Sequence, residues 1–398
     1  MRLRPVLAVA FIGFFVMLVD GYDTLMLSFI APLISKEWSL TSGTMGEIFS
    51  SSFAGSAIGA AVIGTAADRF GRKPMLLISL ALAGTLTLLC AWSQSPVQLM
   101  CFRALSGLGL GGAIPAITAL TAAHASPGRR SAMVTRMLLG YPLGAIVGGA
   151  ITAAVMSSVG WRGVFIGGGL FALLLIPLAA FGLTEGAGST EVVSGGPSRH
   201  PLIETLANGR YKMTVLFCAS VFCLFLTTYF LVSWTPTVLV QNGMPPRQAV
   251  LSAVVLNCGG VVGALVISFI VRRHPILPIA VCLLAGAALI ALIGTGTVLS
   301  GAAILPMIFT IGLLIIGAQL CIPGLCVYLF PPSISATTVG LSASAGRVGS
   351  IIGPLIGGYL LAAQLGWHRL FAIVALPSFG AALAIAYLST LRPKQCSR

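Results

Sequence analysis

Two aspartates lie in the first long apolar stretch of the chain, which runs from about residue 6 to residue 30. Asp20 and Asp23 are three residues apart, so in a helix they project from one face. A carboxylate in the middle of a membrane helix costs roughly 2.5–3.5 kcal/mol on insertion scales, so it needs a partner, a proton or a water-filled cavity. Because two carboxylates this close rarely both stay ionised, we expect one to hold a proton near neutral pH. The pair predicts a proton-carrying site.

Two arginines inside apolar stretches supply the opposite charge. By helical rise, Arg103 lies about 10 Å into its stretch, and Asp23 and Asp20 lie about 12 and 16 Å from the end of theirs. The three charges therefore share one half of the membrane, where Arg103 either forms a structural ion pair with an aspartate or clamps a substrate carboxylate bidentately. Arg347, about 18 Å into its stretch by the same rise, is predicted to be a substrate-binding or coupling charge.

The composition indicates that these residues lie in a membrane protein. The chain has 398 residues, of which 57% are hydrophobic and 8% charged, and its mean hydropathy is +1.04. A soluble domain of this size does not have this balance. The net charge of +14 does not indicate nucleic-acid binding, because the basic residues lie in short gaps between apolar stretches. The nine cysteines are scattered singly, so we expect no metal site and no cofactor.

Twelve membrane spans are predicted, which places both termini on the same side. With the termini inside, fifteen Lys and Arg residues lie on that side and four on the other, so we expect cytoplasmic termini in the cell (inner) membrane. The predicted spans are 6–30, 47–67, 75–93, 97–122, 131–158, 161–182, 212–238, 248–271, 277–299, 302–329, 336–362 and 368–389.

A polar segment, 183–211, divides the spans into two sets of six and is predicted to be a cytoplasmic linker between bundles 1–182 and 212–398. Glycine patterns in the first set recur 206 to 209 residues later, namely those at 109–115, 140–149 and 160–165. Six spans separate the copies, so the two halves have parallel topology. Parallel repeats of this kind predict a substrate site between the halves near the middle of the membrane.

The loop after the second predicted span carries a basic, glycine-rich motif. Its aspartate and arginines are able to form an ion-pair latch at the cytoplasmic edge, although an ordinary basic loop is the alternative. The second half has lost the aspartate, because Arg272 stands there. The motif resembles the signature loop of the major facilitator superfamily, and its gating candidates are Gly64, Asp68, Arg69, Gly71 and Arg72.

Three residues of the second half complete the candidate substrate site. Tyr229 lies deep enough in its span to stack on a flat ligand. Trp234 is closer to the end of that span, where an aromatic residue is most often an interface anchor. Gln319, in the tenth span, is the remaining substrate-binding candidate. His124 ends the fourth span and is expected to be a solvated end residue rather than a proton relay.

Together these residues resemble the aromatic acid:proton symporter family of the major facilitator superfamily. The resemblance rests on Asp20-Gly21-Tyr22-Asp23, the loop 64–73, the arginine and glycines of 103–115, and the motifs at 140–144, 234–237 and 346–354. It implies twelve helices in two six-helix bundles, import of benzoate-like carboxylates with protons, and roles for both aspartates and the matched arginines. The chain departs from the family pattern at His124, Ser335 and Arg272.

The function predicted first is proton-coupled import of a small aromatic carboxylate anion by alternating access, performed by a monomer in the lipid bilayer. Inward movement of an anion opposes the membrane potential by about 2.3 kcal/mol per 100 mV, and an accompanying proton cancels that cost. Efflux or exchange of a different organic anion is the alternative. A non-transporting sensor is less favoured because no soluble output domain is evident, and an enzyme is not expected because no catalytic constellation stands at usable spacing.

Overall fold

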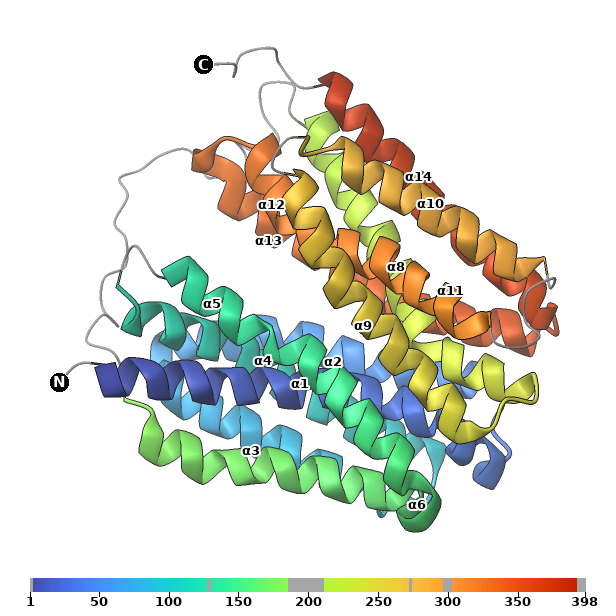
Figure 1. Ribbon diagram of the computed structural model, residues 1–398. Coiled ribbons are helices and arrows are strands. Elements are labelled where there is room, and N and C mark those ends of the chain that lie inside the picture. Colours follow the sequence, from blue (N-terminus) through green and yellow to red (C-terminus); the bar gives the residue numbers. More distant parts are fainter. Residues whose placement is uncertain (1–2, 127–129, 185–210, 272–273, 296–302, 392–398) are drawn as a thin grey trace. The chain divides into compact units, whose positions relative to one another are not determined.

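The computed structural model describes residues 3–126, 130–184, 211–271, 274–295 and 303–391, and every regular element within them is helical (Figure 1). The first half contains α1 (Leu3–Trp38), α2 (Ser42–Phe70), α3 (Arg72–Cys90), α4 (Pro96–His124), α5 (Arg130–Leu138) and α6 (Gly140–Gly182). The second contains α8 (Tyr211–Gln241), α9 (Pro246–Val271), α10 (Leu277–Gly294), α11 (Ile304–Ile311), the π-helical segment η2 (Gly312–Ile316), α12 (Gly317–Leu329), α13 (Pro332–Ala362) and α14 (Gly366–Leu391).

Short sequence signals mark the beginning of α4 and the boundary between α2 and α3. The Ser95 hydroxyl accepts a hydrogen bond from the Gln98 amide at 3.2 Å, and Pro96 occupies the first turn of α4. An N-cap serine followed by proline favours a helix start at this point. Gly71 has φ 99°, a left-handed conformation that suits glycine, and it separates α2 from α3.

Eleven helical stretches of the described residues are long and apolar enough to cross a membrane. The difference from the twelve predicted spans arises at Met133–Gly182, a stretch of 50 residues that covers the predicted spans 131–158 and 161–182. Gly160 lies between them with φ 65° and ψ −178°, a non-helical conformation that kinks the chain, so α6 consists of two helical parts that meet at this residue. Its repeat partner Gly366 has φ 64°, which confirms the predicted match at this turn.

The chain forms two compact units. The first consists of Met1–Ser194 with Pro236–Val254, and the second of Gly195–Thr235 with Val255–Arg398. The predicted linker 183–211 falls outside the described residues except at its two ends, and Arg272 falls outside them as well.

Backbone-to-backbone packing of α6 on α1 organises the first unit. A Cβ on Gly140 or Gly144 would overlap the carbonyl oxygen of Phe14 or Leu18, and one on Gly148 would overlap the Tyr22 ring. Small residues at a spacing of four let membrane helices approach this closely. A matching row of glycines, again four residues apart, packs α13 on α8. In this row Gly349, Gly353 and Gly357 meet Phe222, Leu226 and Phe230. The glycine pattern that was predicted to repeat 209 residues later is thus confirmed by its contacts.

A second set of glycines repeats between other helices. Gly55 and Gly59 of α2 meet the carbonyls of Ala104 and Leu108, and Gly107 of α4 meets that of Ser52. In the second unit the same three contacts join Gly259 to Phe309, Gly263 to Leu313 and Gly312 to Leu256, each residue lying 204 or 205 positions further along the chain.

One predicted match is wrong in its register. The 109–115 pattern was expected to recur at an offset of 208, which pairs Gly109 with Gly317. Gly109 packs on α3 at Ser79 and Ala83, whereas Gly317 packs on α9 at Gly263. The two glycines are therefore not equivalent, because the contacts of these spans repeat at the shorter offset.

Candidate functional site

The fourth helix carries a fully buried arginine in the core of the first unit. Arg103 has no exposed surface, and Asp23 on α1 is 4% exposed. Nη1 of Arg103 lies 3.0 Å from both carboxylate oxygens of Asp23 and donates a hydrogen bond to Oδ1. Nη2 donates to the backbone oxygen of Asp23 at 3.1 Å. The two side chains that were predicted to share a depth therefore form a buried ion pair.

Two hydroxyl groups complete this cluster, and the sequence analysis missed both. Thr87 on α3 donates to Oδ1 of Asp23 at 2.8 Å, and Ser52 on α2 accepts from Nη2 of Arg103 at 3.0 Å. Both hydroxyl-bearing residues are buried. The only signal in the sequence was a run of three serines, 50–52, inside an apolar span. Four helices of the first unit thus position one ion pair.

The pair retains unused hydrogen-bonding capacity. Nε of Arg103 forms no hydrogen bond with any described residue, and Oδ2 of Asp23 has the ion-pair contact with Nη1 but no hydrogen bond. A buried polar atom left in this way costs about 1–3 kcal/mol. An arrangement with an open acceptor on one partner and an open donor on the other is suited to taking up a proton and an anion. Asp20 is also buried, one helical turn before Asp23.

The matching positions of the second unit are apolar. The glycine contacts match α2 to α9 at an offset of 204 and α4 to the α11–η2 stretch at 205, and they match α1 to α8 at 208, because Phe14 and Leu18 correspond to Phe222 and Leu226. By these offsets Leu256 takes the position of Ser52, Ile308 that of Arg103 and Leu231 that of Asp23. All three apolar side chains are buried. Replacing a buried ion pair by well-packed apolar residues is often neutral or stabilising. The helix contacts that the two units share therefore do not need the ion pair in order to pack.

The candidates of the second unit lie on three different elements. Arg347 is half-buried on α13, and Gln319 on α12 has an Oε1 that forms no hydrogen bond with the described residues. Tyr229 on α8 stacks on Phe225 with ring centroids 5.8 Å apart. Trp234 is fully buried and its Nε1 donates to the Pro354 carbonyl at 2.9 Å, so it joins α8 to α13. Trp234 is thus a core residue rather than an interface anchor.

The basic residues of the signature loop bind helix ends. Arg72 donates to the Ala119 carbonyl at 3.4 Å, and Lys73 donates to the Ala180 carbonyl at 2.7 Å. Cations are favourable at these C-terminal ends of α4 and α6. Asp68 is exposed, and within the described ranges it forms no ion pair. The latch role of Asp68 therefore stays a prediction, and Gly64 and Arg69 likewise stay gating candidates.

At the end of α4, His124 has two ring contacts. Its Nδ1 lies 2.9 Å from the Leu120 carbonyl oxygen, and its Nε2 lies 3.2 Å from the Thr184 hydroxyl. These contacts join the end of α4 to the residues that follow α6. They favour a structural role at a partly exposed helix end.

Asp68→Asn is expected to shift the equilibrium toward the inward-open state by about tenfold, the effect of losing one charged hydrogen bond. The reason is that the predicted latch, at the edge predicted to be cytoplasmic, would hold only the state that is closed on that side. Spin labels on the cytoplasmic ends of the two halves measure the shift as a change in distance distribution. Asp68→Glu, which keeps the charge, is the control, and an unchanged distribution in Asp68→Asn would reduce Asp68 to a topology residue.

Comparison with known proteins shows the family of the chain. Residues 13–351 match the Major Facilitator Superfamily. The chain is 32% identical to a gallate transporter of Pseudomonas putida, over 96% of this chain and 92% of that protein. It is 31% identical to a 4-hydroxybenzoate transporter of Acinetobacter baylyi, over 95% and 90%. It is 33% identical to a 3-(3-hydroxy-phenyl)propionate transporter of Escherichia coli, over 96% and 93%.

Solved structures show the same fold. A bacterial homologue of the lysosomal transporter Spinster superposes with a TM-score of 0.79 at 17% identity, covering 98% of each chain. A D-xylose-proton symporter superposes with a TM-score of 0.78 at 16% identity, covering 99% of each chain. The protein is an all-α, multi-pass membrane protein and, as a secondary transporter rather than an enzyme, it belongs to the major facilitator superfamily.

Proposed function

We propose that this transporter imports small aromatic carboxylates together with protons by alternating access. The observation that carries the proposal is the buried Arg103–Asp23 pair, because the second unit has buried apolar side chains at the matching positions. A costly feature that packing does not require is expected to serve function. The relatives named for gallate, 4-hydroxybenzoate and 3-(3-hydroxy-phenyl)propionate carry aromatic carboxylates, which supports that substrate class.

In the proposed cycle, Asp23 exchanges its salt bridge for a proton. Protonation removes the charge that holds the guanidinium of Arg103, and the substrate carboxylate then takes its place as a bidentate partner. The Thr87 hydroxyl, now a donor to Asp23 at 2.8 Å, is able to rotate and accept from the protonated carboxyl instead. One proton neutralises one carboxylate anion, which removes the cost of about 2.3 kcal/mol per 100 mV for moving that charge inward.

Proteoliposomes with an imposed pH gradient test this function. We expect accumulation of labelled hydroxybenzoates and benzoate above the level in protein-free vesicles, and loss of that accumulation when a protonophore collapses the gradient. Aliphatic acids of similar size are expected to accumulate poorly. Equal uptake of aliphatic acids would overturn the substrate class, and uptake that depends on internal substrate instead of the gradient would indicate exchange.

Arg347→Lys is expected to weaken binding of the aromatic acid about tenfold or more. A guanidinium fork holds a carboxylate by geometry as well as by charge, and a charged hydrogen bond contributes roughly 1.5–3 kcal/mol. Thermal stability should change little because the positive charge remains. Arg136→Lys on α5, an exposed arginine of the first unit, is the matched control in the same ligand titration. Unchanged affinity in Arg347→Lys would remove Arg347 from the binding site.

A further inference from the structure

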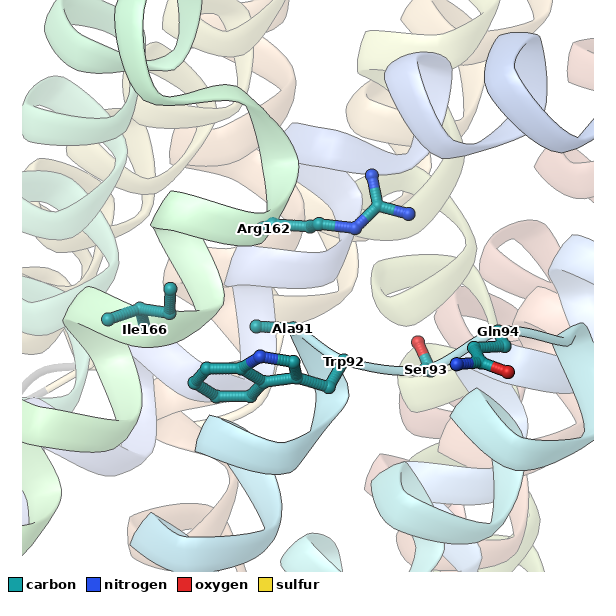
Figure 2. Close-up of a pocket in the computed structure, with 6 residues that line it drawn as sticks. All are labelled: Ala91, Trp92, Ser93, Gln94, Arg162 and Ile166. Atoms are coloured by element: carbon teal, nitrogen blue, oxygen red, sulfur yellow. The ribbon is translucent and has the colours of Figure 1, made fainter.

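A pocket of about 330 Å³ opens on the first unit where α3 ends and the second part of α6 begins. The distribution of basic residues assigns this end to the outside of the membrane. Figure 2 shows Ile166 and the Trp92 indole toward one side of the pocket, and the Arg162 guanidinium with the side chains of Ser93 and Gln94 toward the other. The pocket is therefore amphipathic, with an apolar wall and a cationic, hydrogen-bonding wall.

The guanidinium in this pocket is held in place by two neighbours. Nη1 of Arg162 donates to Oε1 of Glu37 at 2.7 Å, and the guanidinium carbon lies 4.2 Å from the centroid of the Trp161 ring. Trp161 in turn donates to Oε2 of Glu37 at 2.6 Å. Glu37 occupies one of the five N–H donors of Arg162. The remaining donors, on a guanidinium whose orientation is already fixed, suit the oxygens of a phosphate.

An apolar stripe continues from this charged end along α6. Arg162, Ile166, Leu170 and Leu174 are spaced four residues apart and lie on one face of the helix. Leu174 is 68% exposed and Trp92 is 58% exposed, as expected of large hydrophobic side chains that face lipid. The stripe from Arg162 to Leu174 is about 18 Å long by helical rise. The charged Arg162 at one end of this exposed apolar stripe matches the arrangement of a phospholipid, which has a charged head group at one end of its apolar acyl chains.

Glu37 does not line the pocket itself but lies beside it, 2.7 Å from Arg162, and the charges of these two residues indicate which lipid fits. Glu37 neutralises Arg162, so a purely anionic group gains little net attraction there. A zwitterionic head group offers a phosphate to Arg162 and an ammonium to Glu37. A primary ammonium has N–H donors for the carboxylate, whereas a quaternary ammonium has none. We propose that this pocket binds a phospholipid with a primary-ammonium head group, with its phosphate on Arg162, its ammonium on Glu37 and one acyl chain along Ile166, Leu170 and Leu174.

Lipid retention by the purified full-length protein tests the proposal. Native mass spectrometry would compare synthetic phospholipids with identical chains and ethanolamine, choline or glycerol head groups. We expect the unmodified protein to retain the ethanolamine lipid about tenfold better than the choline lipid, the effect of one charged hydrogen bond. Glu37→Gln should abolish this preference while phospholipid still binds, and Arg162→Gln should weaken all three lipids.

A second variant distinguishes loss of lipid binding from misfolding of the protein. Trp92→Ala leaves the contacts among Glu37, Trp161 and Arg162 in place but removes the apolar wall, and it should weaken all three lipids about equally. Arg136→Gln, far along the chain on α5, should leave retention unchanged. Equal retention of the three head groups by the unmodified protein would overturn the proposal, and so would displacement of the lipid by benzoate, which would make the pocket a site for the aromatic acid instead.

Discussion

Replacing Asp23 by leucine and Arg103 by isoleucine together is expected to leave the first unit folded and to abolish accumulation driven by a pH gradient. The second unit already holds leucine and isoleucine, Leu231 and Ile308, at the matching positions of the same packing frame. Substitution of a buried ion pair by apolar residues of similar volume is often neutral, or stabilising by about 1–4 kcal/mol. Transport is expected to fail because the proposed cycle then has neither its proton carrier nor its carboxylate partner.

The single variants provide the contrast. Arg103→Ile alone leaves the Asp23 carboxylate buried without its cation, which typically destabilises a protein by about 3–5 kcal/mol. Asp20→Asn should keep the fold and lose gradient-driven accumulation. Asp23→Asn should also lose accumulation, and it should lower thermal stability because it leaves the buried Arg103 guanidinium without its counter-charge. Thermal unfolding in detergent and uptake by proteoliposomes measure the two effects separately. Full accumulation by the double variant would end the claim that this pair couples protons to transport.

Gly55→Ala is expected to lower the yield of folded protein strongly. The added Cβ would overlap the Ala104 carbonyl oxygen, and backbone atoms cannot rotate away, so α2 and α4 must separate along their whole contact. Overpacking a well-filled core costs about 1–3 kcal/mol, and occasionally more. The measurement is the melting temperature together with the monodisperse fraction on size-exclusion chromatography.

Two further alanine variants make this result specific. Gly259→Ala, the repeat partner in the second unit, should be equally harmful because its Cβ would overlap the Phe309 carbonyl oxygen. Gly167→Ala on α6 has no atom within 4 Å of its added Cβ, so it should be tolerated and favour the helix by up to about 1 kcal/mol. Comparable stability of Gly55→Ala and Gly167→Ala would contradict close backbone packing of α2 on α4.

The sequence predicted which charges meet but not what surrounds them. Helical rise fixes the depth of Asp23 and Arg103, and opposite charges at one depth in a membrane have few other partners. Thr87 and Ser52 were missed because depth alone does not give the rotation of α3 and α2 about their axes. Hydroxyl side chains are also frequent in membrane helices, where most of them bond within their own helix. The fold was more predictable because glycine spacing reports directly on helix contact.

The signature loop shows a different limit. Arg72 and Lys73 lie a few residues from Asp68, and proximity in sequence favoured an ion pair between them. In the structure the two cations bind carbonyls of Ala119 and Ala180, which are distant in sequence. Only the three-dimensional packing brings the ends of α4 and α6 to this loop.

The π-helical segment changes the spacing at which small residues of the second unit meet their neighbouring helix. In α4, Gly107 and Gly111 are four residues apart and both face α2; in the second unit, Gly312 and Gly317 are five apart and both face α9. The segment Gly312–Ile316 absorbs the extra residue, because a π-helix closes its hydrogen bonds over one more residue than an α-helix. A spacing of five residues across this segment therefore keeps both glycines of the second unit on the side of α9, as a spacing of four does for α2 in α4.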